Sequence, residues 1–316
     1  MKTIPCGVYP VMITPYNQDN SIDYGAVDAI VDYYYSMGCH GIFAVCQSSE
    51  MFFLSENERA QLAERVVRAS AGRMCVVASG HTSAAFEDQV RELKRIQDAG
   101  VDAVVMISSL LARRDQGEDV AIGNMKRLLD ALPDADFGMY ECPMPYKRLL
   151  SDDMLIAMAD SDRFSFIKDT CCSAQLISHR LHLAAGRVQI FNANAETFYD
   201  TLLDGASGFS GIMANYHADL YVWLIKHYLD KPILARKVAA FLALFSSAEG
   251  WTYPVNAKYH MGRVGVPMEI ISRVCDCSGF MDSIDRHAVD TLITAEQAVR
   301  DMIEEDSQNE TSSGGI

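Results

Sequence analysis

The stretch Phe164-Ser165-Phe166-Ile167-Lys168-Asp169-Thr170 joins a short apolar run to a lysine. A run of this kind is typical of a buried strand. Burying an unpaired ammonium is costly, so Lys168 must either find an acidic partner or lose its proton. A neutral lysine amine is a nucleophile that forms Schiff bases with ketones and aldehydes. An ordinary ion pair with the adjacent Asp169 is the alternative interpretation.

Similar short runs occur along the chain and alternate with amphipathic stretches. The predicted strands are Val8–Thr14, Gly41–Val45, Met74–Ser79, Ala103–Ile107, Phe137–Tyr140, Phe164–Lys168, Val188–Asn192 and Gly208–Ile212. The clearest helical stretches between them are Tyr24–Met37, Glu56–Ala69, Ala84–Ala99 and Ala121–Leu132. Such alternation predicts an α/β fold, a (β/α)8 TIM barrel. A doubly wound open sheet is the alternative, but no Gly-x-Gly-x-x-Gly follows the first run.

Local signals mark several helix ends and the division of the chain. Ser55 with Glu58 predicts a capping box, and Gly38 and Gly100 suit C-terminal caps. From about Ala218 the pattern is helical without further strands. We therefore expect a barrel over residues 1–225, a small C-terminal helical domain over 226–303, and a polar tail over 304–316 that is disordered.

Composition excludes several classes of function. The chain has 316 residues and a formal net charge of −15, which argues against binding to nucleic acid or to an anionic membrane surface. No apolar stretch approaches the roughly 20 residues of a membrane span, and the start of the chain has no signal-peptide pattern. The nine scattered cysteines predict reduced thiols and a cytoplasmic location. The pairs Cys171-Cys172 and Cys275-Asp276-Cys277 lack further ligands at metal-site spacing, so no metal is expected.

The predicted strands end in residues whose side chains can take part in catalysis or binding. Catalytic groups of a TIM barrel lie at the C-terminal ends of its strands. Lys168 ends the sixth strand and Tyr140 the fifth, while Cys46-Gln47-Ser48-Ser49-Glu50 follows the second and Gly205–Gly211 surrounds the eighth. In this arrangement Lys168 can form an imine and Tyr140 can move protons. The Ser48-Ser49 hydroxyls and amides can hold a carboxylate.

Each of these residues also has a structural interpretation. Tyr140 alone is more often a core tyrosine, and Ser48-Ser49 can simply cap the next helix. The glycine-rich eighth strand can bind phosphate. His40 and His81 are lone histidines that suit structural roles, and Lys258 is a competing nucleophile within the helical region.

Taken together, these segments resemble the pyruvate-dependent class I aldolases of the dihydrodipicolinate synthase and N-acetylneuraminate lyase type. The similarity extends from about Gly7 to Asn256. It rests on five segments: Gly7–Tyr16, Glu50–Ser55, Tyr140 with Pro143, Ile167-Lys168-Asp169, and Gly208–Asn215.

The resemblance implies a Schiff base between Lys168 and pyruvate or another 2-oxo acid, with Tyr140 as general acid and base. It further implies that Ser48 holds the carboxylate and that Ser210 contributes through its backbone. Gln47 and Ser49 complete the expected substrate-binding set. No cofactor is implied beyond the covalent imine on Lys168, and the implied assembly is a homo-oligomer, a tetramer or a dimer.

The chain departs from the family pattern at three places. Gln47 replaces the first hydroxyl residue of the loop, and an amide does not relay a proton as a hydroxyl does. Ser108-Ser109-Leu110-Leu111 replaces the stretch that carries the relay tyrosine. Pro145 stands where the synthases have an arginine, with Lys147 and Arg148 shortly beyond. These departures argue against an authentic dihydrodipicolinate synthase and leave the imine chemistry intact.

The sequence therefore predicts a Schiff-base lyase or aldolase acting on a 2-oxo acid, by carbon–carbon cleavage or formation or by dehydration of a keto-deoxy sugar acid. The alternative is a catalytically impaired protein of the same fold that binds a 2-oxo acid or regulates in response to it. Such a protein would form the adduct without turnover.

Overall fold

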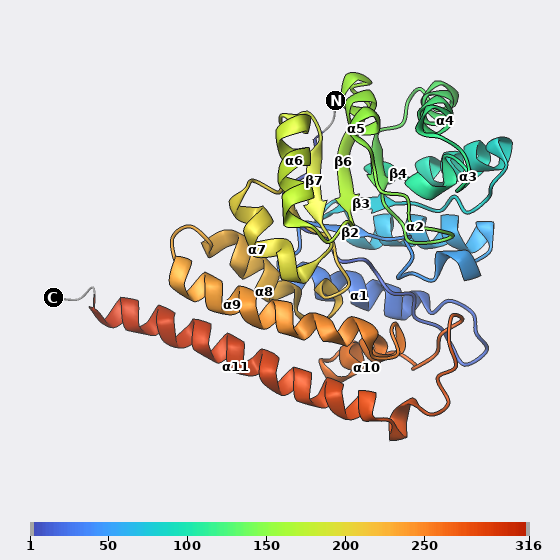
Figure 1. Ribbon diagram of the computed structural model, residues 1–316. Helices are drawn as coiled ribbons and strands as arrows, with labels where there is room; N and C mark the ends of the chain where they lie inside the picture. Colours follow the sequence, from blue (N-terminus) through green and yellow to red (C-terminus); the bar gives the residue numbers. More distant parts are fainter. Residues whose placement is uncertain (1–2, 314–316) are drawn as a thin grey trace.

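The computed structural model describes residues 3–313, and the side chains of residues 3–309. Eight parallel strands lie in the order β1-β8-β7-β6-β5-β4-β3-β2. The two ends of this sheet meet: Phe43 N donates to Pro10 O at 2.9 Å, and Met12 N donates to Phe43 O at 3.0 Å. The sheet is thereby closed, and helices surround it (Figure 1). The predicted TIM barrel is confirmed.

The strands are short and buried. They are β1 Gly7–Val8, β2 Gly41–Phe43, β3 Cys75–Ala78, β4 Ala103–Ile107, β5 Phe137–Tyr140, β6 Phe164–Asp169, β7 Gln189–Asn192 and β8 Gly208–Phe209. All eight lie within the predicted runs or extend them by one residue. β1 is much shorter than predicted, because Pro10 has no N–H to donate to a neighbouring strand.

Each strand is followed by a helix on the outside of the barrel. These helices are α1 Tyr24–Ser36, α2 Glu56–Ser70, α3 Phe86–Asp98, α4 Glu118–Ala131, α5 Asp152–Asp160, α6 Ala174–Ala184, α7 Ala195–Leu203 and α8 Ala214–His227. The capping box of Ser55 and Glu58 is present at the start of α2. Gly38 and Gly100 follow α1 and α3 with φ of 79° and 86°, which confirms them as C-terminal capping residues.

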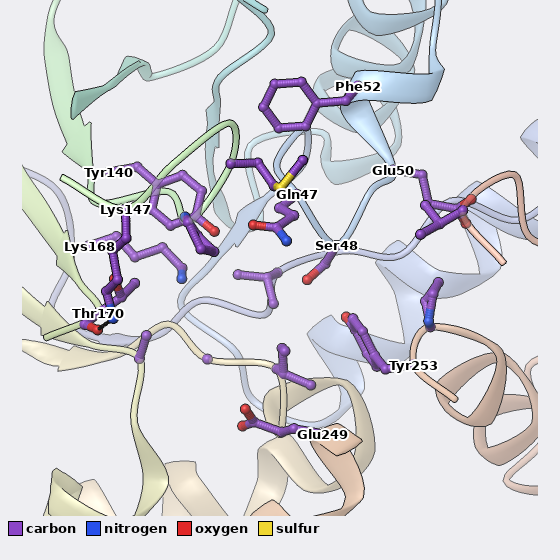
Figure 2. Close-up of a pocket in the computed structure, with 18 of the residues that line it drawn as sticks. Gln47, Ser48, Glu50, Phe52, Tyr140, Lys147, Lys168, Thr170, Glu249 and Tyr253 are labelled. Atoms are coloured by element: carbon purple, nitrogen blue, oxygen red, sulfur yellow. Dashed lines mark hydrogen bonds between the residues drawn. The ribbon is translucent and has the colours of Figure 1, made fainter. Parts of the chain in front are cut away.

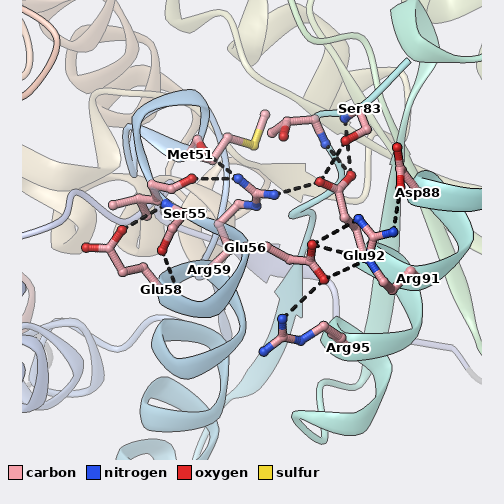
Figure 3. Close-up of polar contacts among 12 residues, drawn as sticks. Met51, Ser55, Glu56, Glu58, Arg59, Ser83, Asp88, Arg91, Glu92 and Arg95 are labelled. Carbon is pink, nitrogen blue, oxygen red and sulfur yellow. Dashed lines mark hydrogen bonds and ion pairs between the residues drawn. The ribbon is translucent and has the colours of Figure 1, made fainter. Parts of the chain in front are cut away.

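A buried ion pair fixes two of the loops at the mouth of the barrel. Arg59 on α2 donates to Glu92 on α3 at 2.7 Å and to Leu54 O at 2.6 Å (Figure 3). Glu92 also accepts from the backbone N–H groups of Thr82 and Ser83, at 2.9 and 3.2 Å. The loop after β3 and the end of the loop after β2 are therefore held by the same pair.

The chain continues beyond the barrel as helices packed on one side of it. These elements are α9 Pro232–Phe245, η3 Ser246–Gly250, α10 Val255–Arg263, η4 Phe280–Asp282 and α11 Ile284–Ser313. In Figure 1, α9 lies beside α7 and α8, and the long α11 runs across the outer side of α9 and α10. The predicted boundary at 225/226 falls near the end of α8.

The C-terminal segment differs from the predicted disordered tail. Helix α11 continues to Ser313, and only residues 314–316 of the predicted tail lie outside the described residues. Met302 and Ile303 pack against the core, and Asp306 accepts from Lys231 Nζ at 2.6 Å. A polar composition suggested disorder, but these contacts hold the helix beyond residue 304. Within the described residues, no helix is both long and apolar enough to cross a membrane.

The closure of the barrel depends on close approach of β1 and β8. A Cβ at Gly208 would lie 1.9 Å from Gly7 O, a backbone atom that cannot move alone. We expect Gly208→Ala to lower the free energy of unfolding by about 2 kcal/mol or more. Gly123→Ala on α4 is the control, because nothing lies within 4 Å of its added Cβ and alanine favours the helix. Urea denaturation measures both; equal stability of the two variants would contradict this account.

Candidate active site

A cavity of about 420 Å³ opens at the C-terminal ends of the strands. Lys168, Tyr140, Gln47 and Ser48 all line it, together with Pro143, Lys147 and Thr170 from the loops after β5 and β6. Figure 2 shows the first four facing the same hollow. Residues far apart in the sequence are therefore brought to one site, as the strand-end argument predicts.

Lys168 lies at the centre of this arrangement and is only 4% exposed. Its Nζ lies 4.4 Å from the centroid of the Tyr140 ring. Among the side chains of residues 3–309, no hydrogen bond or ion pair to this amine is formed. Burial lowers the pKa of Lys168, although the nearby Cys46 and Cys142 thiols, Glu249 and Asp169 act in the opposite direction. The geometry therefore favours the free amine, the nucleophilic form.

Asp169 does not neutralise Lys168, because it pairs with a buried arginine instead. Arg180 on α6 bonds Asp169 through Nη1 and lies 2.8 Å from Glu141 through Nη2. Glu141 also accepts from the backbone N–H groups of Leu150 and Thr170, at 2.8 and 2.9 Å. From α6, outside the barrel, Arg180 thus links the ends of β5 and β6. Because Asp169 is engaged by Arg180, the interpretation of Lys168 and Asp169 as an ion pair has no geometric support.

Tyr140 is held beside Lys168 with its hydroxyl protonated. It is 5% exposed, and its ring packs edge-on against Phe43 with centroids 5.5 Å apart. Burial raises the pKa of Tyr140 well above its ordinary value, and the Cys142 thiol, which shares a hydrogen bond with it, adds to this effect. Cys142 Sγ in turn donates to Gln47 Oε1 at 3.5 Å. A thiol and an amide therefore continue the polar chain from this hydroxyl.

The serines of the loop after β2 have different surroundings. Ser48 lines the cavity, and its side chain shares a hydrogen bond with Tyr253 from the C-terminal helical region. Ser49 is completely buried behind the loop, with Oγ 2.7 Å from Met12 O and 2.8 Å from Ala44 O. Its contacts fasten the loop to the first strand segment, so the structure places Ser49 outside the cavity lining.

Ser210 is also outside the cavity lining. Its backbone N–H donates to Asn192 O at 2.9 Å, and the next two residues, Gly211 and Ile212, line the cavity. Of the six site residues that the sequence predicts, the structure brings together Lys168, Tyr140, Gln47 and Ser48. Ser49 and Ser210 do not line the cavity.

The remaining basic candidates are also placed by their contacts. Lys147 lines the cavity and donates to Thr170 O, whereas Arg148 turns away and pairs with Glu118 at 2.9 Å. Lys258, the competing nucleophile, is buried in an ion pair with Glu50 at 2.6 Å. His81 accepts from Ile107 N through Nε2 at 2.7 Å, and burial lowers its pKa to about 3, so it is neutral.

Glu249 and Tyr253 are among the polar residues of the cavity that sequence reasoning missed. Both come from the segment between α9 and α10, which the sequence predicts only as part of a helical region. A signal was present in Trp251-Thr252-Tyr253-Pro254, an aromatic and proline cluster that interrupts the helical pattern. Thr252 has φ of 52°, and the chain turns there toward the barrel mouth.

Comparisons with known proteins agree with this fold. A sequence model of the Dihydrodipicolinate synthetase family matches residues 5–274. A 4-hydroxy-tetrahydrodipicolinate synthase of Anaplasma marginale (strain Florida) is 25% identical over 241 residues, covering 76% of this chain and 78% of that protein. An N-acetylneuraminate lyase of Mediterraneibacter gnavus is 24% identical over 219 residues, covering 69% and 68%.

A similar solved structure is that of YagE, a prophage protein of E. coli K12 from the dihydrodipicolinic acid synthase family, in complex with pyruvate. It superposes with a TM-score of 0.81 at 19% identity and covers 92% of this chain and 98% of that chain. At this identity the likeness shows the common fold.

Substitution of Arg180 tests whether its ion pairs with Glu141 and Asp169 stabilise the ends of β5 and β6. Removing Arg180 leaves two buried carboxylates without a counter-charge, so Arg180→Met should lower the free energy of unfolding by about 3–5 kcal/mol at neutral pH. The loss should shrink as the pH falls, because protonated carboxyls need no counter-charge. Denaturant unfolding at several pH values measures both effects.

The matched control is Arg187→Met, which removes an exposed pair with Asp160 at 2.7 Å. Such a pair contributes no more than about 1 kcal/mol. A loss of similar size in the two variants would contradict the structural role of Arg180.

Proposed function

The chain belongs to the dihydrodipicolinate synthetase family, and from that premise we propose that it is a lyase or aldolase that forms a Schiff base between Lys168 and a 2-oxo acid. The observation that carries the proposal is the buried amine of Lys168, which has no hydrogen-bond or ion-pair partner among the described side chains and lies in a cavity beside the Tyr140 ring. The pyruvate bound in the related YagE structure supports a 2-oxo acid as the ligand.

The positions of Lys168 and Tyr140 suit the steps of imine formation. The neutral amine of Lys168 adds to the keto carbon, and the carbonyl oxygen becomes the hydroxyl of a carbinolamine. Tyr140 donates a proton to this hydroxyl, which leaves as water while the nitrogen keeps its hydrogen, and the tyrosinate then regains a proton from solvent. The resulting protonated imine withdraws electrons from the neighbouring carbon–carbon bond and so lowers the barrier to its cleavage or formation.

The rest of the cavity sets which 2-oxo acid is accepted. Ser48 is placed to hold the carboxylate, with Tyr253 supporting its side chain. Phe52, Met144 and Val274 give the outer part of the cavity an apolar wall, and Lys147 adds a cation. An authentic dihydrodipicolinate synthase is not favoured, because Gln47 stands in place of the first relay hydroxyl and Ser108-Ser109-Leu110-Leu111 in place of the stretch that carries the relay tyrosine.

Borohydride reduction in the presence of pyruvate tests the covalent step. We expect one pyruvate-derived adduct on the peptide that contains Lys168, and none in Lys168→Arg, as measured by mass spectrometry. The Lys258 peptide is an internal control, since its amine is ion-paired with Glu50. An adduct that persists in the Lys168→Arg protein would exclude the mechanism. An adduct without turnover on any 2-oxo acid would favour the alternative, a binding or regulatory protein.

The pH dependence of adduct formation tests the state of the amine. Protonation blocks the nucleophile, so the trapping rate should rise with pH through the pKa of Lys168. Burial places that pKa below the ordinary 10.5, so cyanoborohydride trapping should level off below this pH. Tyr140→Phe should slow trapping by about 100-fold at neutral pH through loss of proton transfer. A plateau reached only above pH 10.5, or a Tyr140→Phe rate equal to wild type, would contradict the proposal.

A further inference from the structure

Glu249 presents an unpaired carboxyl group to the cavity. The short turn η3 carries it, between α9 and α10, outside the barrel proper. Figure 2 shows Glu249 on the side of the hollow away from Tyr140 and Phe52. Within residues 3–309, whose side chains are described, its oxygens make no hydrogen bond or ion pair. A half-buried carboxyl without a partner has a desolvation cost that a ligand can relieve.

Glu249 is surrounded by groups that act on its charge. Glu196 faces it from α7, and Lys168 faces it from β6. The other titratable groups that sense its charge are Cys172 after β6, Tyr216 and Tyr221 on α8, and Tyr253. Glu196 is held in place by Ser246 Oγ at 2.8 Å and Asn194 Nδ2 at 2.5 Å.

These surroundings allow both the protonated and the ionised form of the Glu249 carboxyl group at neutral pH. Burial and then the charge of Glu196 raise the pKa of Glu249 to about 7, against the opposing effect of Lys168. A group with a pKa near the working pH is well suited to take and return a proton. Tyr140, in contrast, stays protonated, since burial raises its pKa well above the ordinary value.

The position of Glu249 also restricts the ligand. Pyruvate carries a carboxylate, a keto group and a methyl group, and none of these can donate a hydrogen bond to a carboxylate. A carboxylate at this side of the cavity therefore calls for a ligand longer than pyruvate, with a donor beyond the keto carbon. A hydroxyl group is such a donor.

We propose that Glu249 is the catalytic acid–base residue that serves the C4 hydroxyl group of the 2-oxo acid substrate. This proposal rests on the imine at Lys168 proposed above. Glu249 takes the proton of the C4 hydroxyl as the C3–C4 bond breaks, and C4 becomes an aldehyde or ketone carbonyl. The electron pair of that bond moves to C3 and neutralises the iminium as an enamine. Glu249 then returns its proton to C3, and water releases pyruvate and the free amine of Lys168.

Glu249→Gln tests the role, because it keeps the shape of the side chain and removes the base. Pyruvate release is measured from 4-hydroxy-2-oxoglutarate and from keto-deoxy sugar acids with a C4 hydroxyl. We expect kcat of the variant to fall by about 100-fold or more. Borohydride trapping of pyruvate on Lys168 should not fall, because imine formation does not use Glu249 and loss of the Glu249 charge can only lower the pKa of Lys168 further.

Glu196→Gln provides a second test, the pH dependence of kcat. This dependence would not change if Glu249 had only a structural role. Its amide oxygen can still accept a hydrogen bond in place of one carboxylate oxygen, while its charge is lost. The pKa of Glu249 should fall, so the acidic limb of the kcat profile should move to lower pH. The profile of kcat is the relevant one, because Lys168 is already part of the imine in the bound state.

The outcomes separate this proposal from the one it rests on. Trapping of pyruvate without cleavage of any C4-hydroxy 2-oxo acid would overturn the role of Glu249 and leave the imine standing. Full cleavage activity of Glu249→Gln, or an unmoved acidic limb in Glu196→Gln, would overturn it as well. Failure of the wild-type protein to trap pyruvate would overturn both proposals.

Discussion

The burial of Lys168, with no ion-pair partner among the side chains of residues 3–309, is the constraint on which the site depends. A charged ammonium in that position is costly, so the fold favours the neutral amine. Asp169 next to it in the chain would cancel this effect, but Arg180 engages Asp169 from the outer side of the barrel and holds Glu141 at the same time. The arginine therefore supports the nucleophile indirectly: it keeps the nearest carboxylate occupied and fixes the two strand ends that carry Lys168 and Tyr140.

The sequence predicted the parts of this arrangement that depend on strand ends. The apolar runs before Lys168 and Tyr140 placed both residues at one edge of a parallel sheet, and Ser55 with Glu58 located the start of α2. Side-chain direction within loops follows from tertiary contacts instead. Consecutive residues such as Ser48 and Ser49 thus separate, the first toward the cavity and the second into the core. The contribution of Glu249 depends on how a turn between two helices folds back, which no periodicity encodes.

The helical region after the barrel is therefore part of the site. Glu249 and Tyr253 reach the cavity from the segment between α9 and α10 and Val274 from the segment after α10, whereas Lys168 and Tyr140 come from the barrel. Under the proposed function, the covalent step and the choice of substrate would belong to different parts of the chain. The predicted assembly into a dimer or tetramer stays a prediction.

Glu50 connects these two parts. It follows β2 with φ of 60°, is buried, and accepts from Lys258 Nζ and Arg273 N at 2.6 Å and from Ser272 Oγ at 3.1 Å. Its charge is compensated only while the segment after α8 stays in place, and the same holds for Lys258. Detaching the C-terminal helices would separate Glu50 from Lys258, Ser272 and Arg273, and the loss of this buried pair and its hydrogen bonds costs several kcal/mol. Barrel and helices consequently behave as one cooperative folding unit, and a chain cut after α8 would lose the loop that carries Ser48 along with the helices.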